Sequence, residues 1–147
     1  MCGIAGFLNS KLTFEELKKD ISKMIVGINH RGPDQNGYWI DQDHKLVIAN
    51  TRLSIQDLSI HGSQPMHSKS DRYVIVFNGE IYNFKELKNN YLKNNFNIGN
   101  SDTEVFLDLI DKLGIEKTLD LIDGMFAFAI WDKKNKILIL GRDRIGE

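Results

Sequence analysis

The spacing of apolar and polar residues predicts four helices. The clearest covers residues 13–28, where apolar side chains recur at helical spacing along one face. Thr13 and Glu16 form a capping-box pattern at its start. Its apolar positions are Phe14, Leu17, Ile21, Met24, Ile25 and Ile28. The other predicted helices begin at Asn83 with Glu86, run from Ser101 with Glu104 to a stop at Gly114, and cover Glu116–Ile122.

The remaining apolar runs predict strands. They are Gly3–Leu8, Leu46–Leu53, Tyr73–Phe77, Met125–Trp131 and Lys136–Gly141. The last two are joined by a polar turn and are typical of a hairpin. Both alternating faces of the run 125–131 are apolar, so this strand should lie in a sheet that is covered on both sides. The long polar stretches 30–36 and 57–71 predict loops.

Composition narrows the class of protein. The chain has 147 residues, 41% of them hydrophobic and 27% charged, which is ordinary for one soluble domain. Nineteen basic residues balance twenty acidic ones, so the charge indicates neither nucleic acid nor membrane as a partner. No apolar run approaches the ~20 residues of a membrane span, and no positive residue precedes the apolar start as in a signal peptide. We therefore expect a cytoplasmic protein.

Cys2 is the first candidate for chemistry. As the single cysteine it excludes an internal disulfide, and it could simply be a small apolar residue of an N-terminal strand. However, removal of Met1 is expected before so small a second residue. Cys2 would then carry both a thiol and a free α-amine, which titrates at about 7.7–8.0 in model peptides. A nucleophile and its base would thus share one residue.

The pair Asn78-Gly79 is the second candidate. It directly follows the apolar run 73–77, so we expect it at the end of a strand. Asn-Gly is typical of a turn, which is the simpler interpretation. Alternatively, the Asn side-chain amide and the Gly N–H are two neutral donors that can converge on one oxyanion, and glycine permits a close backbone approach.

Three further polar features are candidates, although each also has a simple interpretation. His30–Asp34 is a polar turn, and without a second histidine at ligand spacing it does not indicate zinc. Arg52 ends an apolar run, so its charge either faces solvent or holds an anion. Asp102 lies in the first turn of a predicted helix, where a negative charge is favourable in itself.

Together these motifs closely resemble the class II glutamine amidotransferase domain, an N-terminal nucleophile hydrolase, in the form found in glutamine-hydrolysing asparagine synthetases. The matching stretches follow the order of that family and span the chain. They are Met1–Gly6, His30–Asp34, Arg52–Ile55, Gln64–Met66, Asn78–Asn83, Ser101–Glu104 and Gly124–Ala129.

The resemblance implies an α+β fold, a four-layer αββα sandwich of mostly antiparallel sheets. It also implies that residues 1–147 form a glutaminase domain that is incomplete at its C-terminal end. In the family, further strands and an ATP-using synthetase domain follow. We therefore expect that synthetase domain to be absent from this chain.

The resemblance also implies a role for each site residue. Cys2 would attack the side-chain amide of glutamine and form a thioester, which water hydrolyses to glutamate. Asn78 and Gly79 would hold the oxyanion, Arg52 would pair with the substrate α-carboxylate, and Asp102, aided by Glu80, with its α-ammonium. The pocket would be completed around Leu53, Ser54, Ile55 and Gln56. This set suits a zwitterion with a neutral side chain, because a guanidinium fork matches a carboxylate.

The implied partners are glutamine and an ammonia-accepting synthetase domain that makes asparagine from aspartate. No metal or cofactor is implied for glutamine hydrolysis, whereas ATP and magnesium would serve only the missing domain. The oligomeric state stays open, with a homodimer as one option. Two alternatives also stay open: a related amidotransferase with a sugar or β-lactam precursor as acceptor, and a non-catalytic fragment or glutamine-binding module.

Overall fold

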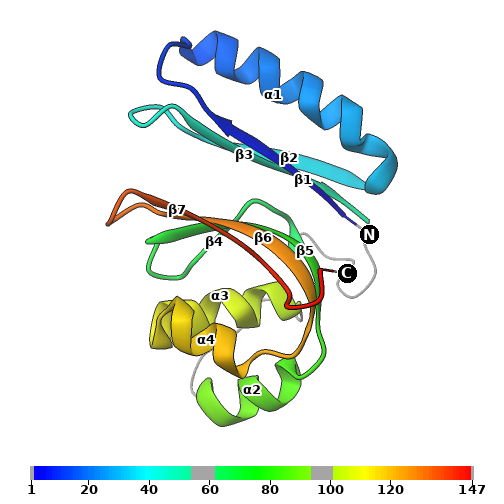
Figure 1. The fold of residues 1–147 in the computed structure, drawn as a ribbon, viewed down its shortest axis with the longest axis vertical. Coiled ribbons are helices and arrows are strands. Elements are labelled where there is room, and N and C mark those ends of the chain that lie inside the picture. Colours follow the sequence, from blue (N-terminus) through cyan, green and yellow to red (C-terminus); the bar gives the residue numbers. More distant parts are fainter. Residues whose placement is uncertain (1, 54–61, 94–100, 147) are drawn as a thin grey trace.

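The computed structural model describes residues 2–53, 62–93 and 101–146. In this part of the chain two antiparallel sheets pack face to face between helices (Figure 1). The helices are α1 (Phe14–Ile28), the short 3-10 helix η1 (Asn29–Arg31), α2 (Phe84–Tyr91), α3 (Asp102–Leu113) and α4 (Ile115–Leu121). The strands are β1 (Gly3–Leu8), β2 (Gln35–Asp41), β3 (Leu46–Arg52), β4 (Met66–His67), β5 (Tyr73–Ile81), β6 (Gly124–Asp132) and β7 (Ile137–Arg142). None of the described helices is long and apolar enough to cross a membrane.

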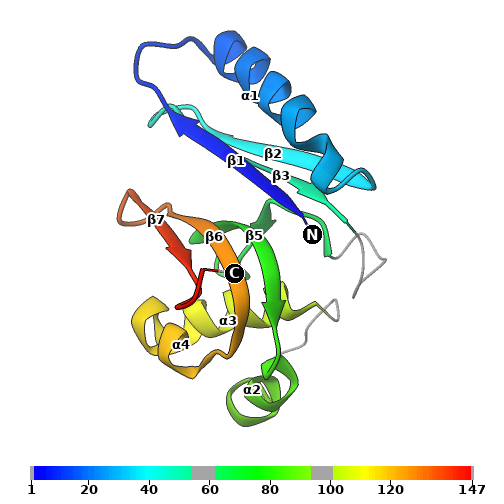
Figure 2. The ribbon, with the colours of Figure 1, turned by 45° about the vertical axis from the view of Figure 1, so that its right-hand side comes forward.

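The first sheet has the strand order β1-β3-β2, and α1 covers its outer face (Figure 2). Leu17 and Ile21 of the helix pack against Val47 of β3. The predicted capping box is present, because the Thr13 side chain accepts from the Glu16 N–H and the Glu16 carboxylate accepts from the Thr13 N–H. Met24, expected on the buried face, is 37% exposed at its margin.

The second sheet has the order β4-β5-β6-β7, and α2, α3 and α4 lie on its outer side (Figure 1). An aromatic cluster fixes α3 on this sheet. The Phe106 ring of α3 lies 5.8 Å from the Phe77 ring of β5 and 5.4 Å from the Phe128 ring of β6, measured between centroids. Such tilted and edge-on pairs add to the stability that burial alone supplies.

The interface between the two sheets is a separate apolar core. Ile48 of β3 packs there against Val76 of β5 and Trp131 of β6, and Trp39 of β2 packs against the same cluster. The Trp131 indole N–H also donates to the Asp41 carboxylate of the first sheet at 2.9 Å. Strand β6 is thus covered on both faces as predicted, and the expected α+β sandwich of four layers is confirmed.

Three predictions of local structure were wrong. No strand was predicted over β2, whose start lies inside the expected loop 30–36, and β4 lies inside the expected loop 57–71. Most importantly, β5 does not end at Phe77 but continues to Ile81, paired with β6 throughout. Asn78-Gly79 therefore lies inside a strand, since pairing with β6 overrides the local preference of Asn-Gly for a turn.

Candidate functional site

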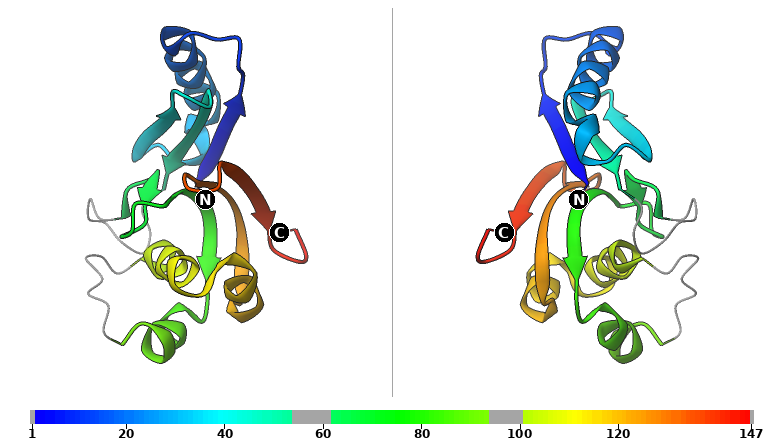
Figure 3. Two further views of the ribbon diagram at one scale, coloured as in Figure 1. Left: turned by 90° about the vertical axis from the view of Figure 1, so that its left-hand side faces the viewer. Right: turned by 90° about the vertical axis from the view of Figure 1, so that its right-hand side faces the viewer.

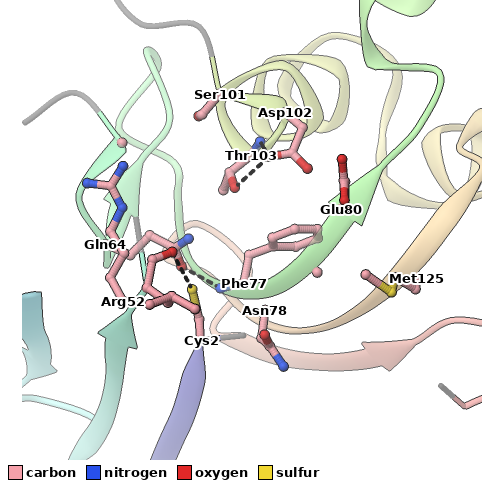
Figure 4. Close-up of a pocket in the computed structure, with 13 residues that line it drawn as sticks. Cys2, Arg52, Gln64, Phe77, Asn78, Glu80, Ser101, Asp102, Thr103 and Met125 are labelled. Carbon is pink, nitrogen blue, oxygen red and sulfur yellow. Dashed lines mark hydrogen bonds between the residues drawn. The ribbon is translucent and has the colours of Figure 1, made fainter. Parts of the chain in front are cut away.

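One cavity collects the described members of the predicted site. It has a volume of about 120 Å³ and lies where Cys2 and the end of β3 meet β5 and the start of α3 (Figure 4). The predicted residues that line it are Cys2, Arg52, Leu53, Asn78, Gly79, Glu80 and Asp102. The remaining predicted residues, Ser54, Ile55 and Gln56, lie outside the described residues.

Cys2 reaches the cavity because β1 runs antiparallel to β3. Gly3 pairs with Thr51, so the beginning of the chain meets the end of β3, at the junction between the two sheets (Figure 3). The Cys2 Sγ lies 3.8 Å from the Leu53 carbonyl oxygen, to which it donates, and the residue is half-buried. The thiol is therefore at the cavity and not sealed in apolar packing.

Arg31 gives the His30–Asp34 stretch a structural role that the sequence did not reveal. Its Nε donates to the Cys2 carbonyl oxygen at 3.2 Å. In the same turn, the Asp34 N–H donates to the Arg52 carbonyl oxygen at 3.1 Å. The turn after α1 thus supports the backbone of two residues that line the cavity.

Gly79 directs its backbone N–H away from β6. Its partner in the ladder is Phe126, whose own N–H and C=O both bind Asp143, on the β7 side, at 3.1 and 2.8 Å. In an antiparallel pair, opposite residues either exchange both hydrogen bonds or exchange none. Because the N–H and C=O groups of Phe126 point towards β7, the N–H of Gly79 points to the edge of β5 that lies away from β6.

The two neighbours of Gly79 on this edge are bound by side chains of the cavity. The Phe77 N–H donates to Gln64 Oε1 at 2.6 Å, and the Ile81 N–H donates to Asp102 Oδ2 at 2.8 Å. The Gly79 N–H lies between these two along the same edge. Strand β4 covers this edge of β5 only at Val74 and Ile75, nearer the start of the strand. At Gly79 the edge therefore borders the cavity.

The carbonyl group of Phe77 is also bound by a side chain. Asn50 of β3 donates to it from Nδ2 at 3.4 Å, across the interface between the sheets. Asn50 is 1% exposed, and its Oδ1 has no hydrogen-bond partner in the described part of the chain. Both backbone groups of the residue before Asn78 are thus held by carboxamides, one from Gln64 and one from Asn50.

Glycine is required at position 79 by the ladder itself. A Cβ atom built there would lie 2.2 Å from the Met125 carbonyl oxygen and 2.5 Å from the Phe126 Cα. Both atoms belong to the backbone of β6, which cannot move aside without breaking the sheet. Any larger residue would therefore force the two strands apart.

Arg52 is buried, so the interpretation as a solvent-facing charge is wrong. It is 7% exposed, and its Nη1 donates to Gln35 Oε1 of β2 at 3.2 Å. The fork of donors of a guanidinium suits a carboxylate. In Figure 4, Arg52 and Asp102 lie on opposite sides of the cavity.

Asp102 is more than a favourable charge at a helix start. It is 6% exposed at the N-terminus of α3, where Ser101 caps the helix by accepting from the Glu104 N–H. Burial raises the pKa of Asp102, and the nearby charge of Glu80 acts in the same direction, although the N–H groups of Ile81 and Thr103 partly oppose the rise. A cation in the cavity would stabilise its charged form.

Several lining residues had no predicted role. They are Gly62, Gln64, Phe77, Ser101, Thr103 and Met125. Four of them, Gln64, Ser101, Thr103 and Met125, belong to stretches that match the family, and this was the one signal in the sequence that could have drawn attention to them. The contact between Gln64 and Phe77 depends on how the chain folds back, which residue type alone does not predict.

Comparison with known proteins agrees with this geometry. A family model described as "Glutamine amidotransferase domain" matches residues 1–147. Asparagine synthetase [glutamine-hydrolyzing] 2 of Bacillus subtilis is 43% identical, asparagine synthetase B [glutamine-hydrolyzing] of Escherichia coli 37%, and asparagine synthetase [glutamine-hydrolyzing] 2 of Oryza sativa 38%, each over 99% of this chain. The chain spans only 19%, 26% and 24% of the length of these relatives. The family expected from the motifs is confirmed, and the chain belongs to the glutamine amidotransferase domain family.

Proposed function

We propose that this domain hydrolyses the side-chain amide of glutamine to glutamate and ammonia, with Cys2 as the nucleophile once Met1 has been removed. The observation that carries the proposal is the meeting of four groups at one cavity. They are the Cys2 thiol, the β5 edge that carries the Gly79 N–H, the buried cation Arg52 and the buried anion Asp102.

These groups, together with the Cys2 α-amine and the Asn78 side chain, supply the chemistry. The α-amine of Cys2 takes the thiol proton, and the sulfur attacks the amide carbon while the carbonyl electron pair moves to oxygen. The Asn78 side chain and the Gly79 N–H stabilise this oxyanion. When the oxyanion collapses, the C–N bond breaks, and the leaving nitrogen takes the proton from the amine and departs as ammonia.

A thioester between Cys2 and the glutamyl group remains. Water attacks its carbonyl carbon and gives a proton to the α-amine, and the C–S bond then breaks. The sulfur regains its proton and glutamate is released. One residue thus serves as nucleophile and as base in both halves of the reaction.

Recognition of the amino-acid end of glutamine follows from the charges across the cavity. Arg52 pairs with the α-carboxylate and Asp102, with Glu80, pairs with the α-ammonium. The raised pKa of Asp102 supports this assignment, because a buried carboxylate without a cation beside it is costly to ionise and a bound ammonium lowers that cost.

In the whole protein, we propose that the ammonia amidates aspartate in an ATP- and magnesium-dependent synthetase domain. The support is the names of the relatives, which are glutamine-hydrolysing asparagine synthetases. An acceptor assay on the full-length protein is the test. Asparagine should form from aspartate, glutamine and ATP, and formation of a different amide instead would overturn this part.

The glutaminase proposal is tested by mass and by glutamate release. The mature protein should lack Met1 in its intact mass and should release glutamate from glutamine. Cys2→Ala should retain glutamine binding and lose release, with Cys2→Ser as the closest oxygen analogue. Equal release by wild type and Cys2→Ala would overturn the role of Cys2. Binding without any release by the processed wild type would instead indicate a glutamine-binding module.

A further inference from the structure

We infer that Gln64 is a positioning residue for the oxyanion donors, and that it acts together with Asn50 by holding the backbone of Phe77 from both sides. The inference rests on the proposed function, because it concerns the residue that directly precedes Asn78-Gly79. Neither amide needs to contact glutamine for this role.

The contact of Gln64 is the stronger of the two. Its Oε1 accepts the Phe77 N–H at 2.6 Å, from the segment that precedes β4. At this point β4 no longer pairs with β5, since their ladder includes only Val74 and Ile75 of β5. At Phe77, the Gln64 side chain thus accepts the hydrogen bond that the backbone of a neighbouring strand would otherwise accept. The backbone of β5 keeps the same orientation from Phe77 to Gly79.

Asn50 fixes the other group of the same residue. Its Nδ2 donates to the Phe77 carbonyl oxygen at 3.4 Å, and that carbonyl belongs to the peptide unit whose nitrogen is the N–H of Asn78. Asn50 lies in β3 of the first sheet, opposite Ile4 of β1, so this bond also links the two sheets near Cys2. Its buried Oδ1 gains no hydrogen bond within the described residues, so an apolar side chain of similar size would lose only the bond to Phe77.

This arrangement matters for chemistry because oxyanion donors must be in position before the charge develops. A shift of about 1 Å in a group near the reacting atoms can cost roughly 100-fold in rate. The Asn78 side chain and the Gly79 N–H follow Phe77 directly, and they lie between the N–H bound by Gln64 and the N–H of Ile81 bound by Asp102.

The first test compares two variants of Gln64 at saturating glutamine. Gln64→Met removes the acceptor and should lower kcat about 10- to 100-fold with KM within about threefold. Gln64→Glu keeps an acceptor for the Phe77 N–H but adds a negative charge to the cavity, so its kcat should lie between those of Gln64→Met and wild type. Gln42→Met, at an exposed position in the β2–β3 turn, is the matched control and should change neither constant. Equal kcat in wild type and Gln64→Met would overturn the inference, as would a kcat of Gln64→Glu below that of Gln64→Met.

The second test separates positioning from stability. Asn50→Leu should lower kcat about 10-fold in protein that urea unfolding shows to be still folded, because the apolar side chain suits the interface core and offsets part of the cost of the lost bond to the Phe77 carbonyl. If the activity of Asn50→Leu merely follows a loss of folded protein, Asn50 is only structural.

The third test does not depend on catalysis. The amide protons of Phe77 and Gly79 should exchange with solvent faster in Gln64→Met than in wild type, and at the wild-type rate in Gln64→Glu. Unchanged exchange in Gln64→Met would overturn the inference. A protein that shows the expected exchange but releases no glutamate would instead contradict the proposed function alone.

Discussion

Asp102 accepts the backbone N–H of Ile81 at 2.8 Å, which ties the first turn of α3 to the last residue of β5. The same carboxylate lines the cavity across from Arg52. The anion of the site is thus placed by the strand that also carries Asn78 and Gly79. The distance between the anion and the oxyanion donors is therefore set within one sheet edge, and we expect small changes there to affect both binding and turnover.

The pH dependence of glutamine binding should reveal Asp102. Burial raises its pKa, so the carboxyl group becomes protonated at a pH above its ordinary value of 3.8. A neutral carboxyl group cannot balance the substrate ammonium, so KM should rise as the pH is lowered towards that value, measured by initial rates of glutamate release. Asp102→Asn should have a high KM at pH 7 and lack this rise. An identical rise in both proteins would assign it to another group.

Arg52→Ala should weaken glutamine binding without slowing the chemistry of the bound substrate. A hydrogen bond to a charged group contributes about 1.5–3 kcal/mol, so KM should rise roughly 10- to 150-fold while kcat stays within a few-fold. Arg52→Lys should lie between the two, because it keeps the charge but loses the fork. Initial rates over a wide range of glutamine concentrations measure both constants. A collapse of kcat with unchanged KM would be inconsistent with a carboxylate contact.

Asn78→Ala is the clean test of the oxyanion donors. Loss of one such donor costs about 100- to 1000-fold in kcat, and KM should change little. The drop should occur with an unchanged far-ultraviolet spectrum, because the half-buried Asn78 side chain is not part of the apolar core. A variant that keeps wild-type turnover would leave the Gly79 N–H as the main donor.

Gly79→Ala should lose activity because the fold is destabilised, whereas Asn78→Ala should lose it because an oxyanion donor is missing. Its Cβ atom would collide with the Met125 carbonyl oxygen in β6, so the variant should lose folded structure together with activity. Thermal unfolding measures this, and we expect a lower midpoint than in Asn78→Ala. If Gly79→Ala melts like wild type, the ladder must be able to widen at this position.

Asp132 should make the stability of the fold depend on acid pH. Its side chain is 5% exposed and lies 2.7 Å from Arg72 Nη2. Although burial alone would raise its pKa, hydrogen bonds from Arg72 and Asn135 hold the pKa below its ordinary value. The stabilisation is therefore present above pH 3.8, the ordinary aspartate value, and is lost as the pH falls through the lower folded-state pKa.

Asp132→Asn should accordingly lower the free energy of unfolding by about 1.5–3 kcal/mol at pH 7, and by progressively less at acid pH. Urea unfolding at several pH values measures this, and Asp120→Asn, at an exposed position on α4, is the control. A difference between wild type and Asp132→Asn that does not shrink in acid would contradict the assignment.

The hydrophobic pattern of the sequence correctly predicted those elements whose formation depends on nearby residues. The capping box at Thr13 and the doubly apolar run 125–131 correctly predicted α1 and the central position of β6. The whole of β2 was missed, because its first residues, Gln35, Asn36 and Gly37, show no apolar alternation and pairing with β3 holds them in a strand. The end of β5 was missed because the turn preference of Asn-Gly is weaker than the ladder with β6.

The candidate site divides in the same way. Residue type and position marked Cys2 and Arg52 as candidates, whereas the resemblance to the family was needed to give Asp102 its role in the site. Residue type could not predict that Gln64 and Asn50 bind one backbone unit, because each contact joins separate strands or loops. Contacts of this kind depend on the packed sheets and can be identified only once the fold is known.

The position of the two tryptophans makes tryptophan fluorescence a probe of the contact between the two sheets. Trp131 and Trp39 both pack in the core between the sheets, and neither lines the cavity. The intrinsic fluorescence of the chain therefore arises from the contact between the sheets. A red shift in emission should follow the entry of water between them, so separation of the two sheets can be followed in unlabelled protein while substrate binding at the cavity leaves the emission largely unchanged.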